Sequence, residues 1–355
     1  MEKGALTSPA TVQTVLGPLP VTALGVTLMH EHILTDVRSW WHPSAENSKR
    51  ALAERPVEMS ILSDLRHDPF LNRDNCHLSD VAAAVEELWD FRELGGQTVV
   101  DPTVRGIGRD PVALRAIAQR TGLHIISGTG YYLEASHPPE IAGASVETIA
   151  AHLLEDIESG DPVLGIRAGL IGEIGVSARF TPAERTSLRA AAQVQRHTHL
   201  PLMIHLPGWE RLAHEVLNVV EAEGGELRRV ILCHMNPSGD DVAYQQALLR
   251  RSCYLEYDMI GMDFFYADQQ AQSPCDEENV RAIAGLLHAG FGPQLLLSQD
   301  VFVKIQLRRY GGNGYGHILR NFVPRLMRHG ITRAEAMSLL IDNPRTVFSW
   351  PEAAC

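Results

Sequence analysis

The sequence predicts a (β/α)8 TIM barrel of the α/β class, and three observations predict it. Short apolar runs bounded by turn residues alternate with segments of helical character, which indicates a parallel sheet. Eight such units follow one another along the 355 residues, whereas an open doubly wound sheet more often has about six strands. No GxGxxG motif follows the first run, so a dinucleotide-binding sheet is not favoured.

Each strand expected in the barrel is a short apolar run. The eight runs are residues 26–29, 98–101, 124–128, 169–174, 202–205, 230–234, 253–257 and 294–298. The segments with helical character include residues 80–94, 111–120, 183–196, 211–223 and 318–328.

Two additions to the barrel are expected. Residues 11–22 read as a short N-terminal hairpin that turns at Gly17-Pro18 and closes the bottom of the barrel. Residues 36–77 are too long for an ordinary strand-to-helix connection, so we expect a long loop after strand one, over the active mouth. Neither a repeat nor an interdomain linker is visible, and one domain over residues 1–355 is the simplest organisation.

Composition excludes several classes of function. A formal net charge of −12 repels phosphate backbones, so nucleic acid is not an expected partner. The first residues lack a signal-peptide core, and no run approaches the ~18 apolar residues of a membrane span. A homodimer is the default assembly, because twofold assemblies are the commonest. The cysteines are odd in number and scattered, which favours a reducing, cytoplasmic location; they are Cys76, Cys233, Cys253, Cys275 and Cys355.

Residues that can bind metal stand at the ends of five predicted strands. His30 and His32 are two positions apart at the end of the first strand, so both imidazoles point the same way. The ends of parallel strands meet at one face of a barrel, where active sites are built. Any one of these residues alone is more often a packed or hydrogen-bonded side chain, but together they favour a metal site. The four further candidates are Glu173, His205, His234 and Asp300.

These ligand types suggest two divalent metal ions. Imidazole nitrogen and carboxylate oxygen without thiolate suit Zn²⁺, our first expectation, and also Mn²⁺, Fe²⁺ or Co²⁺. A pair of ions needs a bridging anionic ligand, and Glu173 is central among the strands. Bridging two cations would also keep its buried carboxylate ionised.

Seven short motifs follow one another along the chain: HEH, GQTVVDPT, GRDP, ISGTGYY, GIRAGLIGEIG, LSQD and GGNGYGHI. With the two strand-end histidines they resemble the phosphotriesterase family of the amidohydrolase superfamily, from about Thr14 to Ser349. Many members place a carboxylated lysine where this chain has Glu173, which resembles the glutamate-bridged, phosphotriesterase-related branch. The resemblance implies that His30, His32 and Asp300 hold the more buried metal and that His205 and His234 hold the more exposed one.

The expected function is that of a metal-dependent hydrolase acting on a small molecule. A metal-bridging hydroxide would attack the carbonyl of an ester, lactone or N-acyl amide, and Asp300 would be the catalytic residue that handles the proton. Two alternatives stay open: a phosphotriesterase that hydrolyses organophosphates, and a non-catalytic barrel that binds metal or ligand. Deamination is not favoured, because deaminases of the superfamily usually lack a bridging carboxylate on strand four.

Substrate contacts are predicted at Tyr132 and Trp40. Tyr132 resembles the aromatic residue that lines the metal site of family lactonases, and Trp40 would form an apolar wall in the long loop. The alternatives are a tyrosine packed at the barrel mouth and a tryptophan that anchors the loop. Family phosphotriesterases carry histidine and acyl-homoserine lactonases carry arginine where this chain has Phe264, so neither specialised activity is supported. Arg66, Arg105 or Arg109 could pair with an anionic substrate group, but each alone is more often a surface or structural arginine.

Overall fold

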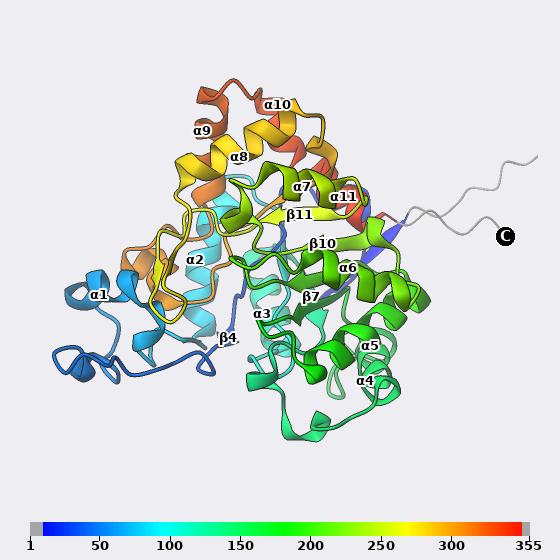
Figure 1. Cartoon of the computed structure of the whole chain (residues 1–355), viewed down its shortest axis with the longest axis horizontal. Helices are drawn as coiled ribbons and strands as arrows, with labels where there is room; N and C mark the ends of the chain where they lie inside the picture. Colours follow the sequence, from blue (N-terminus) through cyan, green and yellow to red (C-terminus); the bar gives the residue numbers. More distant parts are fainter. Residues whose placement is uncertain (1–9, 350–355) are drawn as a thin grey trace, which may run out of the picture.

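The structure, a computed structural model, describes residues 10–349. Eight parallel strands lie side by side at its centre in the order β14-β11-β10-β9-β8-β7-β6-β3, with helices around them (Figure 1). The strands are β3 (Thr27–Leu28), β6 (Thr98–Asp101), β7 (His124–Thr129), β8 (Leu170–Gly175), β9 (Leu202–His205), β10 (Val230–Leu232), β11 (Tyr254–Tyr257) and β14 (Leu295–Leu297).

Backbone hydrogen bonds beyond the first and last strands close the sheet into a barrel. The amide of Asp300 donates to the carbonyl of His30 over 3.1 Å, and the amide of His32 donates to Val301 over 3.0 Å. The fold is therefore the expected (β/α)8 barrel, and each strand is followed by helix. The helices around it are α2 (Val81–Glu93), α3 (Pro111–Thr121), α4 (Val146–Glu158), α5 (Pro182–Thr198), α6 (Ala213–Ala222), α7 (Val242–Leu249), α8 (Asp276–His288), α9 (Val323–Arg328), α10 (Arg333–Ser338) and α11 (Asp342–Phe348).

Local sequence explains where these helices begin. The carboxylate of Asp80 accepts the amides of Ala82 and Ala83 at the start of α2, and Thr181 with Glu184 forms a reciprocal capping box on α5. Helix α9 is preceded by one π-helical segment, Ile318–Phe322, so the helix expected over residues 318–328 is present in two geometries. No helix within residues 10–349 has both the length and the apolarity needed to cross a membrane.

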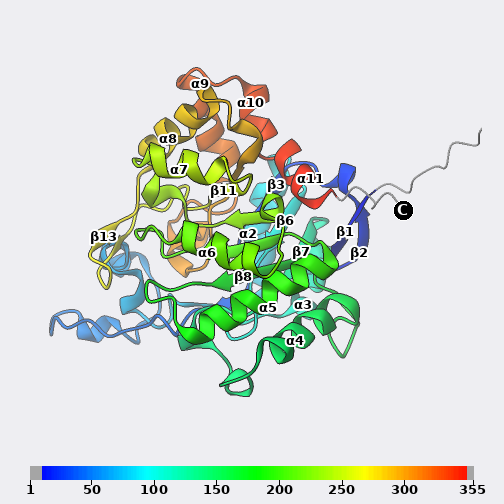
Figure 2. The same ribbon diagram turned by 45° about the vertical axis from the view of Figure 1, so that its right-hand side comes forward.

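The N-terminal hairpin covers the bottom of the barrel, as expected, but turns earlier than expected. Its strands are β1 (Thr11–Thr14) and β2 (Gly17–Pro20), so the turn lies at Val15-Leu16 and Gly17 is already paired. The Thr14 hydroxyl decides this, because it accepts the amide of Leu16 and donates to the carbonyl of Gly17. The hairpin lies at one end of the barrel and the segment after β3 at the other (Figure 2).

The long segment expected after the first strand is present, and it contains short elements that the sequence did not predict. Its ends pair as β4 (Thr35–Asp36) and β5 (His77–Leu78), and it contains helix α1 (Leu62–His67). We call residues 37–76 the extension. It folds because it has a hydrophobic cluster of its own, in which Leu65, Phe70 and Cys76 are buried with residues of the loops after β11 and β14.

Candidate metal centre

The structure brings all six predicted metal ligands together at the carboxyl ends of the strands. Three short distances define the pair of strand-one histidines with Asp300: His30 Nε2 to His32 Nε2 is 3.3 Å, and Asp300 Oδ1 lies 3.4 Å from His32 Nε2 and 3.8 Å from His30 Nε2. His205 Nδ1 and His234 Nε2 lie 2.7 Å apart beside them. Atoms that converge in this way can share metal ions.

Glu173 lies between the two sets of histidines. Its Oε1 is 2.8 Å from His205 Nδ1 and 3.0 Å from His234 Nε2. Towards the other set, Oε1 lies 3.7 Å from His30 Nε2 and Oε2 lies 3.7 Å from His32 Nε2. The carboxylate is therefore within reach of both ligand sets, as a bridging carboxylate must be.

Two of the candidate ligands have left-handed backbone conformations. His234 has φ of 56° and Asp300 has φ of 47°, conformations that cost a non-glycine residue about 1–2 kcal/mol. Hydrogen bonds hold both: the Asp258 carboxylate accepts the amide of His234, and the Gln306 amide group donates to the carbonyl of Asp300. The local strain aims these side chains at the others.

Two of the candidate ligands, Glu173 and His32, already have the protonation state that metal binding needs. Burial by itself would raise the pKa of Glu173, but the nearby His205 and His30 outweigh it and hold this pKa well below its usual range. The carboxylate of Glu173 is therefore ionised. Burial and the neighbouring His30 lower the pKa of His32 to about 3, so its imidazole is neutral and keeps a lone pair for a metal. Burial raises the pKa of Asp300, and acidic neighbours outweigh burial and raise the pKa of His30 and of His234. A metal ion would therefore displace protons from these three groups as it binds.

The charge balance of the site also fits metal ions. Within residues 10–349, the ion pairs of Glu173, Asp258 and Asp300 are all with histidines, and none is with lysine or arginine. All three carboxyl groups are buried. Buried negative charge is costly unless a cation compensates it, and the groups that can do so at this site are protonated histidines or bound metal ions. The donor set of imidazoles and carboxylates is the one expected for divalent metals.

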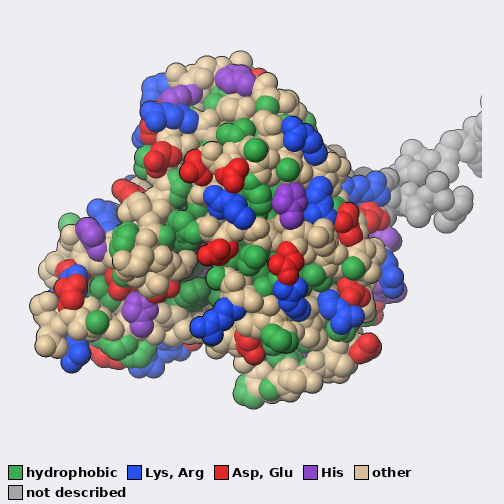
Figure 3. Space-filling view, in the orientation of Figure 1, with side chains coloured by type: hydrophobic (Ala, Val, Ile, Leu, Met, Phe, Trp, Pro, Cys, Tyr) green, Lys and Arg blue, Asp and Glu red, His purple; other side chains and the backbone are tan. Residues whose placement is uncertain are grey.

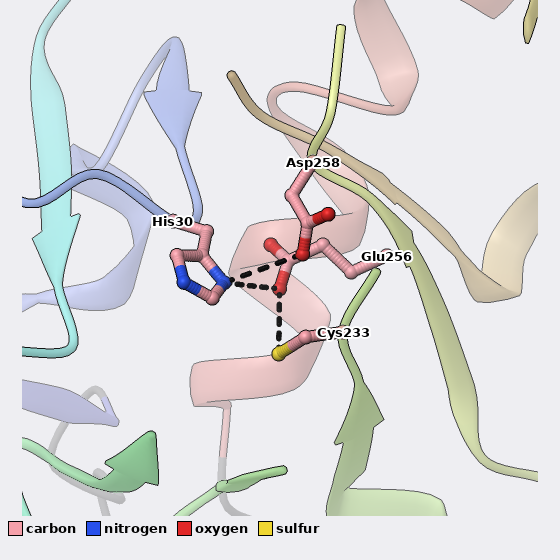
Figure 4. A group of neighbouring side chains, drawn as sticks. All are labelled: His30, Cys233, Glu256 and Asp258. Carbon is pink, nitrogen blue, oxygen red and sulfur yellow. Dashed lines mark hydrogen bonds and ion pairs between the residues drawn. The ribbon is translucent and has the colours of Figure 1, made fainter. Parts of the chain in front are cut away.

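A second layer of buried side chains lies behind His30, and the sequence analysis missed it (Figure 4). His30 Nδ1 lies 3.4 Å from both Glu256 Oε2 and Asp258 Oδ2, and the Cys233 thiol donates to Glu256 over 3.5 Å. Asp258 also accepts a hydrogen bond from His234 Nδ1 at 3.1 Å. Such partners fix the tautomer and orientation of metal-binding imidazoles. The sequence did contain a signal for them, because Glu256 is an acidic residue inside the apolar run 253–257 and Asp258 follows that run directly.

Glu31, the middle residue of the HEH motif, is a further residue that the sequence analysis left without a role. Its carboxylate accepts hydrogen bonds from the Ser298 hydroxyl and from the amides of Gln299 and Val301, over 2.9 to 3.0 Å. These donors belong to the segment that carries Asp300. Glu31 thereby fixes the eighth strand's end relative to the first.

A cavity of about 500 Å³ lies above the metal ligands. It opens between the extension and the barrel, where hydrophobic side chains gather around a hollow in the surface (Figure 3). Both predicted substrate contacts line it: Tyr132, whose hydroxyl is 3.2 Å from His205 Nδ1, and Trp40. Phe264 is buried in the cluster of the extension and does not line the cavity.

The three arginines that could have paired with an anionic substrate group, Arg66, Arg105 and Arg109, do not line the cavity. Arg105 and Arg109 lie beside the buried carboxylate of Asp156, at 2.7 and 3.6 Å, and Arg66 donates to the backbone of Gly311. These contacts explain the first two as structural residues. The cavity is instead lined by Arg179, in the loop after β8, which the sequence analysis did not single out.

The comparisons agree on one family. The model of the phosphotriesterase family matches residues 10–348. A phosphotriesterase-related protein of Nematostella vectensis is 34% identical over 339 residues, which is 94% of this chain and 97% of that protein. An N-acetyltaurine hydrolase of Tetraodon nigroviridis is 35% identical over 338 residues, 94% of this chain and 96% of that one. The crystal structure of a resiniferatoxin-binding protein from Rhodobacter sphaeroides is 51% identical, with a TM-score of 0.94 over 97% of this chain and 98% of that chain.

Proposed function

The chain belongs to the phosphotriesterase family of hydrolases, and from this premise we propose that it is a binuclear metal-dependent hydrolase of amide, ester or lactone carbonyls. One observation carries the proposal: six buried or nearly buried ligand-type side chains converge at the mouth of the barrel, with Glu173 between two histidine sets, and all but His30 line the floor of a cavity. The cavity provides room for a small molecule above the same atoms.

We assign His30, His32 and Asp300 to one ion, His205 and His234 to the other, and Glu173 to both. When bound, two divalent ions would polarise the substrate carbonyl and lower the pKa of a water molecule towards neutrality. Asp300 lines the cavity, so its carboxylate can accept the proton of the attacking water and return it to the leaving group. Tyr132 is placed to donate a hydrogen bond to the substrate beside His205.

The N-acyl amide is our first choice of bond, followed by esters and lactones. Relatives about one-third identical over nearly the whole chain are named for hydrolysis of N-acetyltaurine, which is an N-acyl amide. Zn²⁺ is our first choice of metal, because imidazole and carboxylate ligands suit it, and Mn²⁺, Fe²⁺ and Co²⁺ fit the same ligands.

Metal analysis and an activity panel test the proposal together. Elemental analysis of purified protein should give about two divalent ions per chain, as a binuclear site requires. Protein reconstituted with Zn²⁺, Mn²⁺ or Co²⁺ should then hydrolyse at least one compound in a panel of N-acyl amides, esters, lactones and phosphotriesters. Protein that binds no divalent ion contradicts the proposal, and cleavage of phosphotriesters alone would favour the organophosphate alternative.

A second candidate is a barrel that binds an apolar ligand without turnover. The structure 51% identical to this chain is named for binding resiniferatoxin, not for a reaction. If metal-loaded protein binds resiniferatoxin in calorimetry but cleaves nothing in the panel, this candidate replaces the hydrolase.

A further inference from the structure

Aromatic side chains from separate parts of the chain form one wall of the cavity. The Trp40 and Phe70 rings stack with centroids 5.4 Å apart, and Phe70 lies 5.8 Å from Tyr266 and 6.1 Å from Phe302. Trp209 contacts Tyr266 with centroids 5.3 Å apart. These five residues all line the cavity, and we call them the aromatic wall. Such a surface binds apolar groups through the area that it removes from water.

Arg179 is the one lysine or arginine that lines the cavity among residues 10–349. It is exposed, and within that part of the chain it has no hydrogen bond, ion pair or ring contact. Its loop is nevertheless held in place, because the Glu184 carboxylate accepts hydrogen bonds from Ser177 and Thr181 on either side. An ordered loop therefore presents an unpaired guanidinium to the cavity.

The strand order places Arg179 across the mouth from most of the aromatic wall. Arg179 follows β8, the fourth strand of the barrel, while Phe70, Tyr266 and Phe302 follow the first, seventh and eighth strands. In a closed barrel of eight strands, the fourth strand is opposite the eighth. The metal ligands at the cavity floor lie between the two sides.

Asp268 determines which way round an anionic molecule would lie in the cavity. It lines the cavity from the loop after β11, the same loop that contributes Tyr266 to the aromatic wall. A carboxylate there repels an anionic group from the aromatic side, whereas Arg179 attracts it to the opposite side.

We propose that the substrate is an anionic N-acyl amide, with an apolar acyl group against the aromatic wall and a carboxylate or sulfonate paired with Arg179. This inference rests on the hydrolase function proposed above. An extended molecule of this kind lies across the mouth with its carbonyl over the metal ligands. Guanidinium groups bind carboxylates and other oxyanions through paired hydrogen bonds, so Arg179 selects the charge and Asp268 the orientation.

Three substrates separate the contributions of charge and apolar surface. N-Phenylacetyl-β-alanine carries both features, its β-alaninamide analogue removes only the charge, and N-acetyl-β-alanine removes only the apolar ring. With metal-loaded wild type, we expect kcat/KM to be highest for the first compound. Preference for the neutral analogue overturns the inference.

Variants test the two residues. We expect Arg179→Gln to lower the ratio of kcat/KM for the acid to that for its amide by about tenfold, mainly through KM, and Asp268→Asn to raise it. Phe70→Ala should lower the ratio for phenylacetyl over acetyl substrates by about tenfold. The control is Arg120→Gln, an exposed arginine on α3 that does not line the cavity. Equal losses on acid and amide in Arg179→Gln overturn the inference.

Binding distinguishes failure of the inference from failure of the proposed function. Titration calorimetry of the same compounds measures Kd in metal-loaded Asp300→Asn protein, in which we expect cleavage to be slow, with and without Arg179→Gln. Tight binding of the acid that is lost in Arg179→Gln supports the recognition site even if nothing is hydrolysed. Equal Kd values for acid and amide overturn it even if both are hydrolysed.

Discussion

At the scale of single residues, the site depends on carboxylates in different environments. Glu173 and Asp300 face the cavity, Asp258 orients His234 from behind, and Glu31 holds the segment that carries Asp300. Because each has its own hydrogen-bond partners, substitution of each should have a different effect.

Asp300→Asn tests the proton-transfer role. An amide cannot take a proton from water, so we expect kcat to fall by about 10³-fold on any substrate found for the wild type, within the usual range for a general base. Steady-state kinetics and metal content should be measured together. The control is Asp240→Asn, whose side chain is 90% exposed. Full activity in Asp300→Asn would remove Asp300 from the mechanism.

Glu31→Gln tests the connection between the first and eighth strands. Glutamine has one oxygen where the carboxylate offers two, and its NH₂ group would face a donor, so we expect a loss of about 3 kcal/mol in the free energy of unfolding. Urea titration followed by circular dichroism measures it. Glu86→Gln, an exposed change on α2, should leave stability within about 0.5 kcal/mol. Similar stability of both variants would contradict the role of Glu31.

At the scale of elements, the extension and strand β8 build the site. The extension brings Trp40 and Phe70 over the barrel mouth by packing its own cluster against the loops after β11 and β14. Strand β8 brings Glu173 to the centre, and it can do so because glycines allow close approach to its neighbours.

Gly172→Ala tests the packing of β8. Gly172 has φ of +119°, and an added Cβ would lie 2.2 Å from the carbonyl oxygen of Met203. We expect unfolding free energy to fall by about 3 kcal/mol or more, with loss of metal binding. Gly285→Ala is the matched control, since a Cβ there meets nothing within 4 Å inside helix α8, and it should stabilise by about 1 kcal/mol. A Gly172→Ala protein as stable as wild type would contradict this account.

At the scale of the whole molecule, metal binding and folding should be coupled. At the carboxyl ends of the strands, Glu173, Asp258 and Asp300 are buried without a lysine or arginine partner among residues 10–349. Divalent ions bound there would stabilise the folded chain. The single domain, homodimer and cytoplasmic location stay predictions. Light scattering on the purified protein measures the second.

Metal removal tests the coupling. Dialysis against a chelator should lower the melting temperature by about 4 °C for each ion lost, because binding at about 100 times Kd contributes about 2.7 kcal/mol. Scanning calorimetry before and after re-addition of Zn²⁺ measures the effect. An unchanged melting temperature in protein that has lost its metal would show that the buried carboxylates are compensated in another way.

The sequence alone was enough to predict the barrel and the convergence of the six candidate ligands. Short apolar runs that alternate with helical segments are local patterns in the sequence. Barrel topology then requires the carboxyl ends of the parallel strands to meet at one face. His30, His32 and Glu173 could therefore be placed together without coordinates.

Tertiary structure alone accounts for what surrounds the candidate ligands. Arg179 and Phe70 line the cavity through loop paths that depend on contacts distant in sequence, so no local pattern marks them. Glu256 stands out in the sequence as an acidic residue inside an apolar run, but its contact with His30 depends on the fold. Arg105 and Arg109 are likewise bound to Asp156, about fifty residues away in the sequence. Strand ends are positioned by topology, whereas loop side chains are positioned by long-range packing.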